Sequence, residues 1–183
     1  MSEIIKTGDA WPSGVEFKYI PINPNDPPLA CSVPILLKLD DQIAKLPEGG
    51  NIAIVSVPGA FTPTCTENHI PPFLHNLAKL RSDKKINLLI VLSANDAFVL
   101  NAWGKLLLQG ISDYEGVVFA SDPNAQFAQA HGLSKDASAV GFGIRTARFA
   151  LVISKDKVVK YLGIEEQKGV SVSGYDAIYK ARL

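Results

Sequence analysis

Cysteine is scarce in this chain: Cys31 and Cys65 are the only two among its 183 residues. Two thiols so far apart cannot build the disulfide framework that stabilises small secreted domains. The sequence therefore predicts a reducing, intracellular compartment, which we take to be the cytoplasm. The last three residues, Ala181-Arg182-Leu183, resemble the peroxisomal address Ser-Lys-Leu, so a peroxisomal location is the alternative.

An excess of charge and long apolar runs are also absent. Lys plus Arg number 18, as do Asp plus Glu, so the chain lacks the basic surface typical of proteins that bind nucleic acid or acidic membranes. Its longest apolar runs, residues 52–57 and 86–92, fall well short of the roughly 20 residues that span a bilayer. We expect no nucleic acid partner and no membrane span, and therefore small-molecule or protein partners.

Runs of Val, Ile and Leu alternate with helical patterns, and no Pro/Gly/Ser linker or internal repeat divides the chain. With 47% hydrophobic residues the chain can bury one core, so we expect a single domain over residues 1–183. The order of elements resembles a thioredoxin-like α/β fold, in which helices flank a central mixed β-sheet behind an N-terminal extension. The predicted strands are residues 15–20, 51–57, 86–92, 117–120, 149–153 and 157–161. The predicted helices are residues 62–81 with a kink or a restart at Pro71-Pro72, 95–107 with a cap at Asn95 or Asp96, 122–132 from Asp122-Pro123 to Gly132, and 173–181.

The most informative segment is VPGAFTPTCTENH at residues 57–69, which passes from a buried strand through a Pro/Gly turn into a helix. This order puts Cys65 near the first helical turn, where free backbone N–H groups and the helix dipole favour a thiolate. A free cysteine, with a pKa near ~8.5, is only a few per cent thiolate at neutral pH. Competing interpretations are an inert core cysteine, a capping role for Thr62 and simple strand termination by Pro58.

The joint pattern Pro58-x-x-x-Thr62-x-x-Cys65 resembles the active-site signature of the peroxiredoxins. The longer string VPGAFTPTCTENHIPPF, with NDAFV at 95–99 and AWG at 102–104, is similar to the peroxiredoxin 5-like branch. That branch includes fungal alkyl hydroperoxide reductases and the peroxisomal-membrane-associated peroxiredoxins of yeasts. SDPN at 121–124 and RTARFA at 145–150 continue the resemblance, which runs from about residue 10 to the C-terminus.

The resemblance implies a thiol peroxidase that reduces hydrogen peroxide and alkyl hydroperoxides, with Cys65 as the peroxidatic cysteine. Thr62 would hydrogen-bond the peroxide and hold its reacting oxygen in line with the sulfur, and Pro58 would shield the pocket from water. Arg148 would stabilise both the thiolate and the charge that develops on the leaving oxygen. Without the motif, Arg148 would be read as a surface residue at the start of a strand.

Two further residues match the branch. Arg145 occupies a second basic position and is expected to support Glu67 or the pocket rim. His69, one helical turn after Cys65, can assist thiolate formation, although a packed, hydrogen-bonded histidine fits equally well. Cys65 and His69 have a spacing that suits a metal, but two ligands without a second Cys/His pair predict no metal site, and no cofactor is expected.

Turnover requires removal of the oxygen that Cys65 gains as a sulfenic acid. Cys31 is the only other thiol, so a resolving cysteine of this chain must be Cys31. The resemblance implies a disulfide across a homodimer that thioredoxin reduces. Pairing within one subunit, and a one-cysteine mechanism resolved by glutathione or another external thiol, stay open.

Two other functions compete with this prediction. A disulfide reductase on the same fold is disfavoured because the chain lacks C-x-x-C. A redox sensor or chaperone, in which oxidised Cys65 changes an interaction, is the non-enzymatic alternative. Four aromatic residues are candidates for an apolar pocket suited to alkyl peroxides, although core packing explains them equally well: Phe61, Phe98, Trp103 and Phe142.

Overall fold

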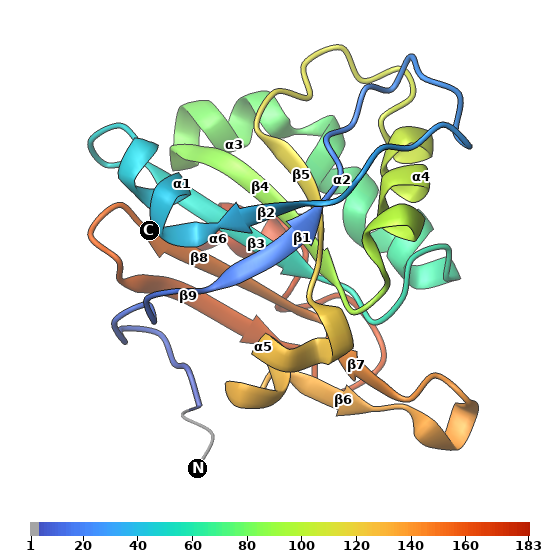
Figure 1. Ribbon diagram of the computed structural model, residues 1–183. Coiled ribbons are helices and arrows are strands. Elements are labelled where there is room, and N and C mark those ends of the chain that lie inside the picture. Colours follow the sequence, from blue (N-terminus) through green and yellow to red (C-terminus); the bar gives the residue numbers. More distant parts are fainter. Residues whose placement is uncertain (1–3) are drawn as a thin grey trace.

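The computed structural model describes residues 4–183 and contains strands and helices in alternation (Figure 1). Its strands are β1 (Glu16–Tyr19), β2 (Ile35–Lys38), β3 (Asn51–Ser56), β4 (Ile86–Ser93), β5 (Val117–Ser121), β6 (Ser134–Asp136), β7 (Ile144–Thr146), β8 (Phe149–Ser154) and β9 (Val159–Ile164). Its helices are α1 (Leu39–Lys45), α2 (Ile70–His75), α3 (Leu77–Lys84), α4 (Ala97–Leu107), α5 (Gln126–Ala130) and α6 (Tyr175–Lys180). The other helical segments are the π-helix η1 (Thr64–His69) and the 3₁₀ turns η2 (Pro123–Ala125) and η3 (Ser138–Val140).

A seven-stranded mixed sheet in the order β2-β1-β5-β4-β3-β8-β9 forms the centre of the fold. Strand β3 runs parallel to β4 and antiparallel to β8, with Ile54 opposite Ile90 on one side and Leu151 on the other. All six residues of β3 are buried. A strand covered on both faces needs apolar residues at successive positions, which explains the continuous hydrophobic run in this part of the sequence.

Two hydrophobic clusters cover the two faces of the sheet. On one face, Ile52 and Ile54 pack with residues of α1 and α5. On the other face, Ala53 and Val55 pack with residues of α2, α3, α4 and α6, and Cys65 belongs to this second cluster. Alternate residues of one strand therefore serve opposite faces, as the two-residue period of a strand requires. The predicted α/β, thioredoxin-like class with a central mixed sheet is confirmed.

The predicted helix at residues 62–81 is three consecutive segments in the structure, η1, α2 and α3. Pro71 and Pro72 lie in the first turn of α2, where backbone N–H groups lack helical partners and proline is tolerated. The second break falls at Asn76, whose backbone leaves the helical region and whose side-chain amide donates to the Pro72 carbonyl at 2.8 Å. The predicted restart at the proline pair is confirmed, because α2 begins at Ile70, whereas the break at Asn76 was not predicted.

The predicted helix start at Asp122-Pro123 is confirmed only for a 3₁₀ turn, η2, which begins at Pro123. The α-helix begins only at Gln126, and the Asp122 carboxylate instead reaches over η2 to accept from the backbone N–H groups of Phe127 and Ala128 at 3.0 and 2.9 Å. The positive φ of Ala125 separates η2 from α5. Strand β2 and helix α1 were not predicted, because segments of four and seven residues show too little periodicity to be recognised.

Candidate active site

Cys65 lies just past the carboxyl end of the buried strand β3, as the second residue of η1, and only 1% of it is exposed. Two contacts join this end of β3 to the segment that carries Arg148. Ser56 donates to the Ala147 carbonyl at 2.9 Å, and Thr146 donates to the Val57 carbonyl at 3.0 Å. Cys65 and Arg148, which are 83 positions apart in the sequence, therefore face each other at this edge of the sheet.

The turn between β3 and η1 is held in a demanding conformation. Phe61 has a φ of 61°, a left-handed value that is uncommon for an aromatic residue. The Ala60 N–H donates to the Asn95 side chain at 2.9 Å, and the Thr62 hydroxyl donates to the Gly59 carbonyl at 2.7 Å. Such strain persists only where surrounding contacts hold it, and it concentrates at functional sites.

Arg148 bridges Cys65 and His69. Its Nη2 donates to the Cys65 Sγ at 3.4 Å, and its Nη1 donates to the His69 Nδ1 at 3.0 Å. A guanidinium is always charged and has donors only. The contact therefore places a positive charge directly beside the sulfur.

His69 is fully buried, and its two ring nitrogens have defined partners. The Nδ1 accepts from Arg148, and the Nε2 lies 2.8 Å from the Ser173 carbonyl. Because a guanidinium only donates and a carbonyl only accepts, the ring is neutral with its proton on Nε2. Burial lowers the pKa of His69 to about 4, the Ser173 contact opposes this, and the Arg148 charge adds to it.

Arg145 lies at the other side of the turn. Its Nη1 donates to the Pro58 carbonyl at 3.3 Å, and its Nε donates to the Phe142 carbonyl at 2.8 Å. Arg145 therefore contacts the backbone of the turn at Pro58. One edge of the sheet thus brings together five of the predicted site residues: Pro58, Thr62, Cys65, Arg145 and Arg148.

Cys31 is exposed and lies outside this group, on the loop that joins β1 to β2. The buried Lys105 of α4 holds that loop, since its ammonium donates to the carbonyls of Pro27 and Ala30. Figure 1 shows the loop arching beside α4. Both Cys31 and Cys65 are free thiols.

Sequence reasoning missed several residues that support the site. Of the two predicted caps of α4, Asp96 is confirmed, since it accepts from two backbone N–H groups at 2.9 Å. Asn95 instead accepts from the Ala60 N–H and holds that turn, a role that was missed. Trp103 is buried and donates to the Thr66 hydroxyl at 3.2 Å. The other three aromatic candidates, Phe61, Phe98 and Phe142, are each about half exposed. In the sequence, the polar character of residues 165–174 was the only indication that a loop here could supply the contacts that Ser173 makes.

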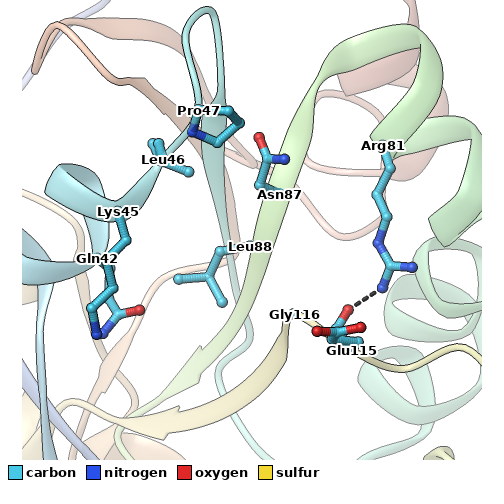
Figure 2. A pocket seen from close by; sticks show the side chains of 9 residues that line it. All are labelled: Gln42, Lys45, Leu46, Pro47, Arg81, Asn87, Leu88, Glu115 and Gly116. Carbon is cyan, nitrogen blue, oxygen red and sulfur yellow. Dashed lines mark hydrogen bonds between the residues drawn. The ribbon is translucent and has the colours of Figure 1, made fainter.

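A pocket of about 400 Å³ lies at the opposite edge of the sheet and is lined in part by Asn87 at the start of β4. Figure 2 shows its lining side chains. Cys65 instead follows the end of β3, which is parallel to β4. Arg81, one of the cationic residues that line this pocket, is paired with Asp113 at 2.5 Å and with the Glu115 carbonyl. Within residues 4–183, no three His, Cys, Asp or Glu side chains gather closely enough to hold a metal ion. Over the same residues, no helix has both the length and the apolar character to cross a bilayer.

Comparison with known proteins gives consistent matches over nearly the whole chain. The family model described as Redoxin matches residues 7–179. A protein of Lipomyces kononenkoae named as a peroxisomal peroxiredoxin is 45% identical over 174 residues, which cover 94% of this chain and 98% of that protein. Peroxiredoxin AHP1 of Chaetomium thermophilum is 35% identical over 95% of this chain and 92% of its own length. The structure of reduced Prx3 from Vibrio vulnificus in complex with hydrogen peroxide has a TM-score of 0.75 at 28% identity, over 96% of this chain and 94% of that one.

A thioredoxin-like fold that holds a buried cysteine against a guanidinium defines a thiol-dependent oxidoreductase of the redoxin class. Within that class, the chain belongs to the peroxiredoxin family. It is a thiol-dependent peroxidase, and its family works through a cysteine sulfenic acid that a thiol donor such as thioredoxin reduces.

Proposed function

We propose that Cys65 is the residue that reacts with the peroxide. The thiolate supplies the electron pair that breaks the O–O bond, the sulfur keeps one oxygen as a sulfenic acid, and the other oxygen leaves as water or an alcohol once protonated. The observation that carries this proposal is the contact of 3.4 Å between the Arg148 Nη2 and the Cys65 Sγ. A positive charge beside the sulfur both favours the thiolate and stabilises the charge that develops on the leaving oxygen.

Thr62 and Pro58 complete the proposed peroxide site. The Thr62 hydroxyl gives its proton to the Gly59 carbonyl, so its oxygen is available to accept a hydrogen bond from the peroxide and align the reacting oxygen with the sulfur. Pro58 limits the access of bulk water, which strengthens the electrostatic interactions in the site. Arg145 supports the rim of the pocket through the Pro58 carbonyl.

We further propose that Cys31 resolves the sulfenic acid of Cys65. Attack by the Cys31 thiolate forms the S–S bond and releases the sulfenic oxygen as water. The exposure of Cys31 supports this role, because a resolving thiol must meet another sulfur and later an external reductant. The proposal includes a homodimer in which Cys31 of one subunit reacts with Cys65 of the other, and thioredoxin as the donor that reduces the disulfide.

The experiment that tests Cys65 is stopped-flow measurement of peroxide consumption by the wild type and by Cys65→Ser. We expect the serine variant to consume no peroxide above background, while wild type reduces one equivalent rapidly and continues when thioredoxin is supplied. Rapid peroxide reduction by Cys65→Ser would eliminate the proposal.

Non-reducing electrophoresis after one equivalent of peroxide tests the resolving step. A covalent dimer that disappears in both Cys65→Ser and Cys31→Ser supports resolution between subunits. An oxidised monomer with a shifted mobility would instead indicate pairing within one chain. Reduction by glutathione without any disulfide between the two cysteines would indicate the one-cysteine mechanism.

Two statements about organisation belong to the same proposal. We propose that residues 1–183 act as a single domain, because both clusters of the core share one sheet. We also propose a peroxisomal location alongside the cytoplasm, supported by Ala181-Arg182-Leu183 and by the name of the Lipomyces kononenkoae relative. Fluorescence microscopy of a fusion with the tripeptide intact or deleted tests this location.

A further inference from the structure

We infer that His69 is a positioning residue that aims the Arg148 guanidinium at Cys65, and that Glu165 holds the loop on which His69 depends. This inference deepens the proposed function and rests on Arg148 acting at Cys65. His69 is buried beside the reactive thiol, and Glu165 lies at the end of β9. Neither residue is needed to contact the peroxide itself.

The first part of the argument is the contact between His69 and Arg148. Arg148 has two terminal nitrogens near the site, one on the Cys65 Sγ at 3.4 Å and the other on the His69 Nδ1 at 3.0 Å. A guanidinium is planar and rigid, so fixing one nitrogen fixes the direction of the other. An acceptor at the His69 Nδ1 therefore determines where the second N–H points.

The second part concerns what holds His69. Its Nε2–H donates to the Ser173 carbonyl at 2.8 Å, and Ser173 lies in a loop that has little regular structure. The carboxylate of Glu165 gathers this loop by accepting from the backbone N–H groups of Ser171, Val172 and Ser173 at 2.6, 2.7 and 2.9 Å. The hydroxyls of Ser171 and Ser173 donate to the same carboxylate, at 2.8 and 2.9 Å.

The third part is that these contacts form a closed ring. The Glu165 N–H donates to the Arg148 carbonyl at 2.9 Å. Glu165 therefore bonds both the loop that holds His69 and the backbone of Arg148. Around the ring, Arg148 donates to His69, His69 to Ser173, Ser173 to Glu165 and Glu165 to Arg148. The ring closes through the covalent framework of these four residues, so each contact restricts the movement of the others.

This ring also argues against a proton-accepting role for His69. The lone pair on Nδ1 is already used by Arg148, and a proton there would direct a second positive charge at the guanidinium. The lowered pKa of His69, caused mainly by burial, agrees with a ring that stays neutral while Cys65 reacts. Glu165 remains ionised throughout, because hydrogen bonds from Ser171 and Ser173 outweigh partial burial and hold its pKa at about 2.

The test compares two rate constants for Cys65 in each variant, that for hydrogen peroxide and that for alkylation by iodoacetamide. Both reactions need the thiolate, but only the peroxide reaction leaves charge on an oxygen that Arg148 must stabilise. We expect His69→Leu to lower the peroxide rate constant about tenfold relative to the alkylation rate constant. His69→Gln, which has an acceptor oxygen and a donor N–H on one planar group, should restore the ratio to within about threefold of wild type.

The Glu165 series applies the same test away from the buried imidazole. We expect Glu165→Ala to lower the ratio of the peroxide rate constant to the alkylation rate constant about fivefold. Glu165→Gln, which retains an acceptor oxygen, should lower this ratio by less than about twofold. Matched controls are His75→Leu and Glu166→Ala, since both residues are exposed neighbours of the residues tested. Neither control should change the ratio.

Several outcomes would overturn the inference. If His69→Gln is as slow as His69→Leu, His69 takes part in proton transfer instead of positioning Arg148. An equal fall in both rate constants would mean that only the ionisation or access of Cys65 changed. If Glu165→Ala and His69→Leu both keep the wild-type ratio of rate constants, the ring of hydrogen bonds does not contribute to the peroxide reaction. Cys65 would still be the reactive thiol. Failure of the underlying proposal is distinct, because it would appear as peroxide reduction by Cys65→Ser.

Discussion

The two cysteines lie in contrasting surroundings. Cys65 is buried at the end of a central strand, beside Arg148 and within a network of hydrogen bonds. Cys31 is exposed on a loop between two short strands, and Lys105 and Asn101 of α4 bond this loop through the carbonyls of Pro27, Ala30 and Ile20. The fold therefore surrounds Cys65 with specific contacts and leaves Cys31 accessible.

This contrast corresponds to two different chemical requirements. Reaction with a peroxide needs fixed charges around the sulfur, because preorganised groups stabilise the developing charge without rearranging. Disulfide formation needs two Cα atoms within about 7 Å and a sulfur that can be reached. A thiol buried as deeply as Cys65 must become accessible before Cys31 can attack it, so the second step depends on local opening around Cys65.

The largest expected effect comes from removing the charge beside Cys65. Arg148→Met should lower the rate constant of the first peroxide reaction about a hundredfold, because the methionine cannot stabilise the charge on the leaving oxygen. Stopped-flow measurement of the first turnover checks this value. Arg145→Met is the matched control, since Arg145 contacts the Pro58 carbonyl and not the sulfur, and it should lose only about threefold. Equal losses in the two variants would contradict the assignment of Arg148.

The next effect concerns stability in acid. The folded state keeps His69 neutral because burial lowers its pKa to about 4, whereas an unfolded chain titrates near 6.5. Between these values the unfolded state binds more protons, so stability falls as the pH drops. At about pH 5 this residue should cost the wild type about 2 kcal/mol.

Urea unfolding near neutral pH and at about pH 5 measures that loss. His69→Gln cannot take up the proton, so its stability should depend less on pH than that of the wild type. Arg148 and Glu165 face the imidazole but stay charged over this range, and His75→Leu serves as the control that keeps the wild-type dependence. The same pH dependence in His69→Gln would show that another group is responsible.

A smaller effect should appear when the Cys31 loop is released from α4. Lys105→Met keeps the length of the buried side chain but removes the hydrogen bonds to the carbonyls of Pro27 and Ala30. We expect the first peroxide reaction to keep its rate, while disulfide formation slows about tenfold because the loop samples more conformations. Quenched-flow alkylation followed by mass spectrometry separates the two steps. Lys79→Met, a substitution of an exposed lysine, is the control, and an unchanged rate of disulfide formation in Lys105→Met would rule out this role.

The smallest effect on the first step is expected for the exposed thiol itself. Cys31→Ser should reduce the first equivalent of peroxide within about twofold of the wild-type rate, because Cys31 is not part of the charge arrangement at Cys65. Sustained turnover with thioredoxin should then fail and return when a small thiol is added. A large loss in the first turnover would mean that the two regions are not independent.

Much of the fold could be predicted because its elements have strong local patterns. The buried strand at residues 51–57 is continuously apolar, and the structure places β3 at Asn51–Ser56. The break at Asn76 and the long reach of the Asp122 carboxylate were missed, because each depends on contacts that local periodicity does not encode. The short strand β2 and helix α1 were missed because so few residues carry their patterns.

By itself the sequence determined the class of the protein. A buried strand, a Pro/Gly turn and a cysteine at the start of a helix form a contiguous segment, so their relation is readable along the chain. Only the tertiary structure decided which groups surround Cys65 and Cys31. Arg148, Ser173 and Glu165 reach the neighbourhood of Cys65 from residues far along the chain, and Lys105 reaches the Cys31 loop from another helix. Their roles follow from the pairing of strands and the packing of helices, which bring distant residues to one edge of the sheet.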